Sequence, residues 1–301
     1  MINRCFFRRY FDKYVVIFAL CVSAYSYCFA QGAVVSYATS FRWFERFPAA
    51  TLESFPSNDQ LNRLTHVIAM GIGPFANGTL FTSNLPNSWN GSSPPNDIWN
   101  GSQNRWLASL VSRAHQRGAK VSICISGESV VFRPATNGST LNTFVTSIVN
   151  FVNVHNLDGV NINWEYPGRL ANGTFDAIVQ NRINEWNQCI ALMQELKHRL
   201  PNKKISISLS ARVPENIEMY PNATIPQQIW EEAHVIYLMT YDVEWPAWQT
   251  HSLASHANGR ITHWANWGTT GGRNLDIRKL HVGSAFYGWP TMIVGSGNIV
   301  S

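Results

Sequence analysis

Three polar residues alternate with apolar ones between Val160 and Glu165. Successive side chains of a β-strand point to opposite faces, so Asn161, Asn163 and Glu165 share one face and the apolar residues between them share the other. A carboxyl group can give and take a proton, and neighbouring amides can orient a polar ligand by hydrogen bonding. The stretch therefore predicts a site for acid–base chemistry, with Glu165 as the catalytic residue.

The residues around this strand define its ends. Asp158-Gly159 is a turn signal before it, and Pro167 prevents regular pairing after it, so Glu165 lies at the carboxyl end. A half-buried strand with one solvated face gives the same alternation. Helical patterns on both sides in the sequence favour instead a parallel strand with both faces buried, whose polar residues point into a barrel. In such barrels a polar residue at the carboxyl end of a strand is typical of a catalytic site.

Seven strand patterns alternate with helical ones along the chain. The predicted strands are 33–37, 66–70, 120–126, 160–165, 205–210, 235–241 and 280–285. The clearest helical patterns cover 102–118, with Ser102 as N-cap, then 140–154, and 175–200. The alternation predicts an α/β fold of the (β/α)8 TIM type. Because no strand or helix pattern follows Pro290, we expect the eighth β/α unit to be lacking.

Composition and charge exclude several classes of protein. The chain has 301 residues, 45% hydrophobic and 14% charged, enough for one large core. Of its net charge of +5, residues 1–30 contribute four basic residues and one acidic residue, or +3, which leaves +2 for the remainder. So weak a charge implies no nucleic-acid or membrane-surface partner.

The first thirty residues have the pattern of a secretory signal. Basic residues precede an apolar run from Tyr14 to about Ala24, and Cys28-Phe29-Ala30 offers small residues for cleavage. We expect residues 1–30 to be a signal peptide of a secreted, extracellular protein and residues 31–301 to be a single barrel domain. An uncleaved membrane anchor is the alternative.

Two cysteines lie beyond the signal pattern. Cys124 points into the predicted barrel and Cys189 lies on an outer helix, so we expect two free thiols. No His or Cys cluster has metal-ligand spacing, and we expect neither metal nor cofactor. Six Asn-x-Ser/Thr sites are candidates for glycosylation in a host that glycosylates: Asn77, Asn90, Asn100, Asn137, Asn172 and Asn222.

The central strand resembles the signature of glycoside hydrolase family 18, the chitinases and their relatives. That signature is Asp-Gly-apolar-Asp/Asn-apolar-Asp/Asn-x-Glu, and 158–165 fits it with Asn161 and Asn163 where two family aspartates stand. Residues 239–242 match the sixth-strand motif, and 279–288 are similar to the seventh. Residues 120–127 are similar to the third, with Cys124 for its usual serine and Ser126 for its first glycine.

The resemblance implies cleavage of β-1,4-linked N-acetylglucosamine in chitin or related glycans by a monomer. In this family the acetamido oxygen of the substrate is the nucleophile, and Glu165 is first acid and then base. Tyr241 and Asp242 are expected to hold the acetamido group or a sugar hydroxyl. The alternatives are that Tyr241 and Met239 are ordinary core residues and that Asp242 is an N-cap. The expected substrate-binding residues are Asn163, Asn161, Tyr241, Asp242, Met239, Tyr37, Tyr287 and Trp289.

The two asparagines are the main departure from the family pattern. Asn163 can still accept the acetamide N–H, but it supplies no negative charge beside a cationic intermediate. We therefore expect slow turnover with an optimum at lower pH than in relatives that keep the aspartate. A lectin that binds chitin without turnover is the alternative, and a fragment that does not fold alone is a third.

The tryptophans fall into two groups. Those within strand or helix patterns are expected in the core: Trp106, Trp164, Trp186 and Trp230. Six others follow strand ends, and two or three of them are expected to stack on sugar rings: Trp43, Trp89, Trp99, Trp245, Trp248 and Trp289.

Overall fold

The computed structural model describes residues 33–39, 54–80, 101–172, 174–211, 227–241, 254–270, 273–284, 292–294 and 298–300. Residues 1–34 and 35–301 are two separate compact units. All of the elements described below belong to the second unit.

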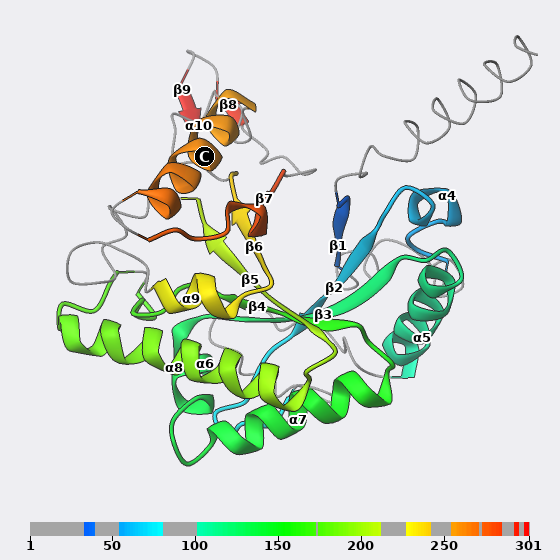
Figure 1. The fold of residues 1–301 in the computed structure, drawn as a ribbon, viewed down its shortest axis with the longest axis horizontal. Helices are drawn as coiled ribbons and strands as arrows, with labels where there is room; N and C mark the ends of the chain where they lie inside the picture. The colour runs from blue at the N-terminus through cyan, green and yellow to red at the C-terminus, as the bar shows by residue number, and fades with distance from the viewer. Residues whose placement is uncertain are drawn as a thin grey trace, which may run out of the picture. The chain divides into compact units, whose positions relative to one another are not determined.

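A seven-stranded parallel sheet forms the centre of this unit, in the order β1 to β7 (Figure 1). Its strands are β1 Val35–Thr39, β2 His66–Ile72, β3 Lys120–Gly127, β4 Gly159–Trp164, β5 Lys204–Ser210, β6 Val235–Met239 and β7 Leu280–Val282. Each strand pairs in parallel with the next strand in the sequence. The predicted TIM-type fold is thus confirmed.

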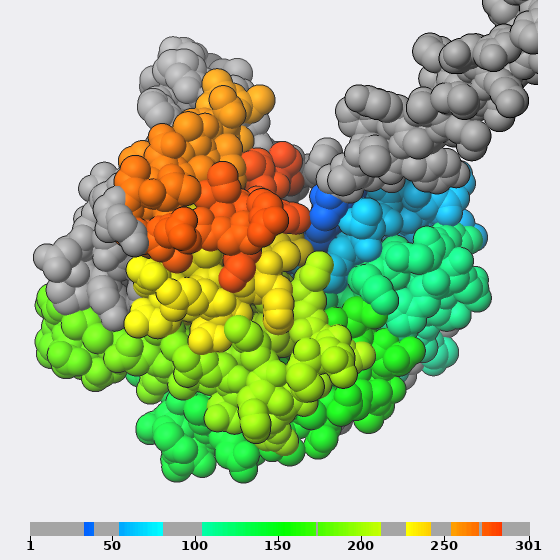
Figure 2. All heavy atoms as spheres, viewed as in Figure 1, coloured from blue at the N-terminus to red at the C-terminus, as the bar shows by residue number. Residues whose placement is uncertain are grey.

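Helices follow the strands along the described chain and lie outside the sheet (Figure 1). They are α4 Asn58–Leu61, α5 Gly101–His115, α6 Ser129–Ala135, α7 Leu141–Val154, α8 Val179–Arg199, α9 Gln227–Glu232, α10 Ala254–Thr269 and the short 3₁₀ helix η2 Ile277–Lys279. Figure 2 shows successive segments following one another over the surface in chain order, as expected for strand–helix units.

Two helix starts differ from the prediction. Helix α5 begins at Gly101, so Ser102 lies in its first turn and is not its N-cap. Helix α8 begins at Val179 and not at residue 175. Phe175 pairs with Arg169 in an isolated β-bridge, and the side chain of Asp176 accepts the backbone N–H of Ile178 at 2.8 Å. These local hydrogen bonds hold 175–178 outside the helix although its apolar spacing is helical.

The chain after β6 differs from the prediction in three ways. Strand β6 ends at Met239, where its pairing with β5 ends, and β7 ends at Val282. Two short strands that the sequence analysis did not predict, β8 Met292–Val294 and β9 Asn298–Val300, then pair with each other in antiparallel fashion. They form a sheet of their own, so the seven-stranded sheet gains no eighth parallel strand from the described residues.

Contacts between distant strands show that the sheet is curled. The Tyr37 hydroxyl on β1 lies 2.8 Å from Ser208 Oγ on β5, and the Tyr37 ring meets the Tyr237 ring of β6 edge-on at 5.9 Å. Strands β1 and β5 are four places apart in the sheet order, so a flat sheet would hold these residues far apart. The inward face of the sheet therefore encloses an interior.

Alternation along the strands separates two cores. The outward side chains pack with the helices into one large apolar cluster, to which Val160, Ile162 and Trp164 of β4 belong. The inward cluster is small and includes Ile68, Cys124 and Tyr237. Most of the remaining inward positions of β3 to β5 are serine or asparagine. The interior is therefore polar, whereas the outer core is apolar.

Gly159 allows the start of β4 to lie between its two neighbours. A Cβ atom at this position would be 2.2 Å from the Lys204 carbonyl oxygen and 2.6 Å from Ser122 Oγ. Neither contact is sterically possible, so the close approach requires glycine. The Gly159 that the sequence marks as a turn is in fact the first residue of the strand.

The buried imidazole of His66 makes the fold sensitive to acid. Its Nε2 lies 2.8 Å from Ser122 Oγ at the amino-terminal end of the sheet. Burial first, and then the positive charge of Lys204, lower the pKa of His66 to about 4. The unfolded chain, with an ordinary histidine pKa of about 6.5, then binds a proton that the folded chain does not bind.

We expect the free energy of unfolding to fall by about 2–3 kcal/mol as pH drops from about 6.5 towards about 4.5, because protonation of His66 favours the unfolded chain. Urea titrations at both pH values measure this loss, and His66→Gln should reduce it. His198→Gln, at an exposed position of α8, is the control and should leave the loss unchanged. Equal losses in wild type and His66→Gln would contradict the account.

Candidate active site

The carboxyl ends of β3, β4 and β5 bring the candidate residues together. Parallel pairing aligns Cys124 with Asn161 and Ser126 with Asn163, and it aligns Asn161 with Ser206 on the other side. Residues that are partners in register point to the same face, so these side chains form rows across the interior. The predicted inward direction of Asn161 and Asn163 agrees with this arrangement.

Asn161 is at the centre of a hydrogen-bond network inside the barrel. Its Oδ1 accepts from Ser208 Oγ at 3.1 Å, from Tyr37 Oη at 3.3 Å and from Cys124 Sγ at 3.3 Å. Its Nδ2 donates to Ser206 Oγ at 3.1 Å. The side chain is fully buried. Both polar atoms of Asn161 are hydrogen-bonded to neighbouring side chains, and the bond to Tyr37 holds that ring in place.

Asn163 has one polar side-chain atom that is hydrogen-bonded and one that has no partner among the described residues. Its Nδ2 donates to Glu165 Oε1 at 2.8 Å and to Ser126 Oγ at 3.1 Å. Its Oδ1 is buried and has no hydrogen-bond partner among the described residues. A buried acceptor without a partner is costly, so this oxygen is suited to a donor supplied by a ligand.

Glu165 follows the last residue of β4, at the carboxyl end where the sequence places it. Its backbone N–H donates to the Gly127 carbonyl at 2.9 Å, and its side chain is partly exposed. The peptide bond from Glu165 to Tyr166 is cis. Burial and the nearby negative charge of Glu165 both raise the pKa of the Cys124 thiol.

A cavity of about 100 Å³ opens beside this carboxylate. It is lined by Glu128, Glu165, Arg169, Leu170 and Ala171. Except for Glu165, none of these was predicted as a site residue. The position of Glu128 directly after the third strand was a usable signal, whereas nothing in the sequence distinguishes Arg169 from an ordinary loop arginine.

Tyr37 and Tyr237 lie close together in the interior, with ring centroids 5.9 Å apart. Burial raises the pKa of Tyr37 well above its ordinary value, and negative charge on Cys124, Tyr237 or Tyr241 raises it further. Tyr241 lies beyond the end of β6, where a Cβ atom at Gly283 would be 3.0 Å from its ring. Met239 aligns with Ser210 at the last pair of β5 and β6.

Other predicted residues can be compared only in part. Asp242, Tyr287 and Trp289 lie outside the described residues, and so do Trp43, Trp89, Trp99, Trp245 and Trp248. The four tryptophans predicted in the core, Trp106, Trp164, Trp186 and Trp230, are all buried. Cys124 and Cys189 are both free and buried, as predicted.

The described side chains include no metal-binding group of three His, Cys, Asp or Glu residues. Likewise, none of the described helices is both long and apolar enough to cross a bilayer.

A parallel sheet curled around polar side chains, with a carboxylate at the carboxyl end of its fourth strand, defines a TIM-type barrel protein. The chain belongs to glycosyl hydrolases family 18, whose model matches residues 33–298. This family is the one that the residues of the central strand resemble.

Individual relatives agree with this assignment. "Secreted chitinase LysM12" of Penicillium expansum is 31% identical over 119 residues, which are 39% of this chain and 7% of that protein. "Probable chitinase 10" of Drosophila melanogaster is 23% identical over 269 residues, which are 85% of this chain and 11% of that protein. The chain thus spans a small part of the length of either relative.

Solved structures support the fold. The crystal structure of the chitinase RmChi1 from Rhizomucor miehei matches with a TM-score of 0.57 at 21% identity, over 82% of this chain and 67% of that one. At this identity the similarity concerns the fold alone.

Burial predicts that both thiols are inert in the folded protein, Cys124 inside the barrel and Cys189 in the outer core. Burial raises the pKa of Cys189 to about 12, and Cys124 is raised as well, so neither forms a thiolate at mildly alkaline pH. We expect iodoacetamide to leave Cys124 and Cys189 unmodified in the native protein and to alkylate both in guanidinium chloride, as read by peptide mass spectrometry. Rapid alkylation of native Cys124 would show that the interior is open.

Proposed function

We propose that the protein is a secreted glycosidase that cleaves β-1,4-linked N-acetylglucosamine in chitin or related glycans, with retention and with reduced activity. The observation that carries the proposal is the pair formed by Asn163 and Glu165. Asn163 orients the carboxylate through its amide N–H and leaves a buried oxygen without a partner beside it. An N-acetyl sugar offers both an N–H for that oxygen and a bond for the acid to cleave.

In the first step the protonated Glu165 donates its proton to the oxygen that bridges two sugars. The acetamido oxygen of the same substrate attacks the anomeric carbon as that bond breaks, which gives an oxazolinium ion and a free sugar hydroxyl. Asn163 Oδ1 accepts the acetamide N–H and keeps the acetamido group folded against the anomeric carbon. Such positioning converts an encounter into an intramolecular reaction.

In the second step the Glu165 carboxylate takes a proton from water as that water attacks the anomeric carbon. The oxazolinium ring opens, the acetamido group is restored and Glu165 is protonated again. Two inversions at one carbon give net retention. Acid–base assistance of this kind contributes roughly 10²–10⁴ in rate.

The remaining predicted residues have supporting roles in this proposal. Tyr241 donates its hydroxyl to the acetamido oxygen, and Asp242 holds a sugar hydroxyl or the acetamide. Tyr37, Met239, Tyr287 and Trp289 line the sugar site. Asn161 acts one row deeper by fixing Tyr37, because its own groups are engaged.

Extracellular location belongs to the same proposal. The signal pattern of residues 1–30 supports it, as does the word "Secreted" in the name of one relative. Glycosylation fits such a location: Asn77 and Asn172 are exposed, and each Oδ1 accepts the hydroxyl of the sequon threonine at 2.7 Å. The expected partner is chitin or an N-acetylglucosamine oligosaccharide, bound by a monomer without a cofactor.

The rival function is a lectin that binds chitin but does not cleave it. Asn161 and Asn163 favour it, because neither supplies the negative charge that would stabilise an oxazolinium ion. The presence of Glu165 favours the enzyme, since sugar binding alone needs no acid beside the cavity.

Glu165→Gln should reduce kcat for a fluorogenic chitobioside by about 10²–10⁴-fold, because glutamine cannot donate and accept the proton. The variant should still bind to chitin beads. Bead binding by a wild type without turnover would instead identify the lectin.

Glu128 tests which mechanism operates, because it is a second carboxylate in the same cavity. If the acetamido group is the nucleophile, Glu128→Gln keeps kcat within about threefold, and a cellobioside without acetamido groups is not cleaved. A loss as large as that of Glu165→Gln, together with cleavage of the cellobioside, would point to an ordinary two-carboxylate mechanism.

Asn163→Asp should raise kcat on the order of tenfold, because a negative charge then faces the cationic intermediate. The optimum should also move to higher pH, because a neighbouring carboxylate disfavours ionisation of Glu165. Asn161→Asp is the matched control: it adds the same charge one row deeper, where it breaks the bond to Ser206, and should give no gain. The pH–rate profiles of all three proteins decide the matter, and unchanged activity in Asn163→Asp would refute the account of slow turnover.

A further inference from the structure

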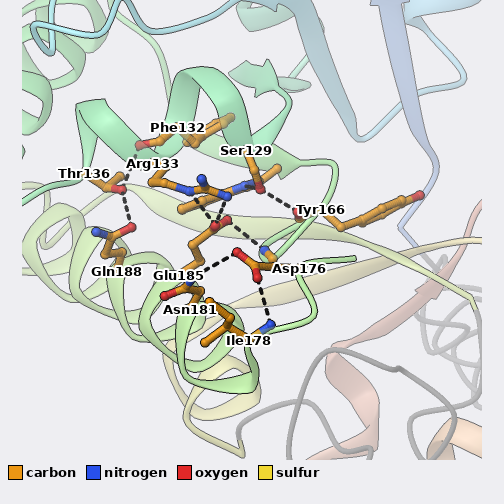
Figure 3. A network of polar contacts seen from close by, with 12 residues as sticks. Ser129, Phe132, Arg133, Thr136, Tyr166, Asp176, Ile178, Asn181, Glu185 and Gln188 are labelled. Atoms are coloured by element: carbon orange, nitrogen blue, oxygen red, sulfur yellow. Dashed lines mark hydrogen bonds and ion pairs between the residues drawn. The ribbon is translucent and has the colours of Figure 1, made fainter. Parts of the chain in front are cut away.

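One buried hydroxyl connects the residues on either side of Glu165. Ser129 Oγ accepts the indole N–H of Trp164 at 2.8 Å. It donates to the Tyr166 carbonyl oxygen at 2.6 Å (Figure 3). Ser129 is the first residue of α6 and is fully buried. Its single hydroxyl therefore ties the end of β4 to the start of the loop that follows, with Glu165 between the two attachment points.

A buried carboxylate from another helix holds the same loop two residues later. Glu185 of α8 is 2% exposed, and its Oε2 accepts the backbone N–H of Gly168 at 2.7 Å. Gly168 has φ +83°, and a Cβ there would lie 2.8 Å from Arg182 Cγ on α8. The loop backbone is thus packed against α8 as well as bonded to it.

The two attachments are joined through α6. Arg133 lies one helical turn after Ser129 and donates from Nε to Glu185 Oε1 at 2.6 Å, while its Nη2 also pairs with that oxygen. Between them Phe132 stacks on the Trp164 ring, with centroids 4.8 Å apart and planes at 12°. We call Ser129, Arg133 and Glu185 the brace.

We infer that Ser129 and Glu185 are positioning residues for the acid Glu165, an inference that rests on the proposed function. Neither side chain lines the cavity or points into the barrel, and both bind backbone or indole groups of 164–168. Burying a carboxylate is unfavourable, and an apolar residue would join α6 to α8 at lower cost. The contact with Gly168 gives the charge a role that packing alone does not.

The position of the Glu165 carboxyl group follows from the backbone on either side of it. The amide of Asn163 holds Oε1 at 2.8 Å, and a shift of 166–168 would move the backbone that carries the acid away from the bridging oxygen. A misplacement of about 1 Å costs on the order of 10²-fold in rate. Loss of the brace should therefore reduce kcat and leave KM nearly unchanged.

The test compares brace variants with variants of a matched pair that joins the end of α6 to α8. Thr136, the C-cap residue of α6, donates to Gln188 of α8 at 3.3 Å, away from the loop contacts (Figure 3). Ser129→Ala and Glu185→Met remove the brace, whereas Thr136→Val and Gln188→Met remove a contact between α6 and α8 without touching 164–168. Kinetics on a fluorogenic chitobioside are measured well below the melting temperature of every variant, and backbone hydrogen exchange of 164–168 is measured alongside.

We expect kcat to fall about tenfold or more in Ser129→Ala and Glu185→Met, with KM within about twofold and faster exchange in 164–168. The two control variants should keep kcat within about twofold. If Glu185→Met does not fold, Ser129→Ala decides alone, because it removes a single oxygen. Equal losses in brace and control variants, or a normal kcat in Ser129→Ala, would overturn the positioning role. A wild type without turnover would overturn the proposed function itself and the brace's role with it.

Discussion

Parallel register is the constraint on which the rest of this structure depends. Because partner residues on adjacent strands point to the same face, a two-residue alternation repeated in β3, β4 and β5 becomes a set of polar rows inside the barrel. The same register sends every second residue outward to the helices, where the large apolar core stabilises the fold. The active-site geometry and the stability of the barrel thus come from one arrangement, and a shift of one residue in β4 would exchange its two faces.

A polar interior is stable only if its hydrogen bonds are made. Asn161 achieves this with three donors to its Oδ1 and one acceptor for its Nδ2, drawn from β1, β3 and β5. The network also explains the curl, since the Tyr37 hydroxyl can reach Asn161 and Ser208 only if β1 comes close to β5. One row nearer the carboxyl ends of the strands, not every polar atom is hydrogen-bonded. Asn163 has a buried oxygen without a partner among the described residues. The proposed function assigns the ligand to this second row, because a buried acceptor without a partner is costly unless a ligand supplies the donor.

The sequence was sufficient for the seven parallel strands, apart from the ends of β6 and β7, because period-two alternation is a local signal. It was insufficient wherever a contact joins residues far apart in the chain. Helix α8 starts late because Asp176 and Phe175 have local partners that compete with helical spacing. Arg169 enters the cavity through the course of a loop, and Ser129 meets Tyr166 only once α6 has packed against β4. Such contacts depend on tertiary packing, which no short pattern encodes.

The inward rows near Glu165 carry no charge of their own. Cys124 and Ser126 on β3, Asn161 and Asn163 on β4, and Ser206 and Ser208 on β5 are all neutral at ordinary pH. Neutral amides cost less to bury than the aspartates that the family signature allows, so they relieve the desolvation penalty of the fold. In the proposed reaction, the same neutrality means that these rows supply no anion to stabilise a cationic intermediate. The chain instead buries a charged pair behind the site, Arg133 with Glu185, where it fixes backbone and not substrate. If the proposed reaction takes place, a barrel of this design gains stability and precise orientation of its acid, and it gives up electrostatic stabilisation of the cationic intermediate.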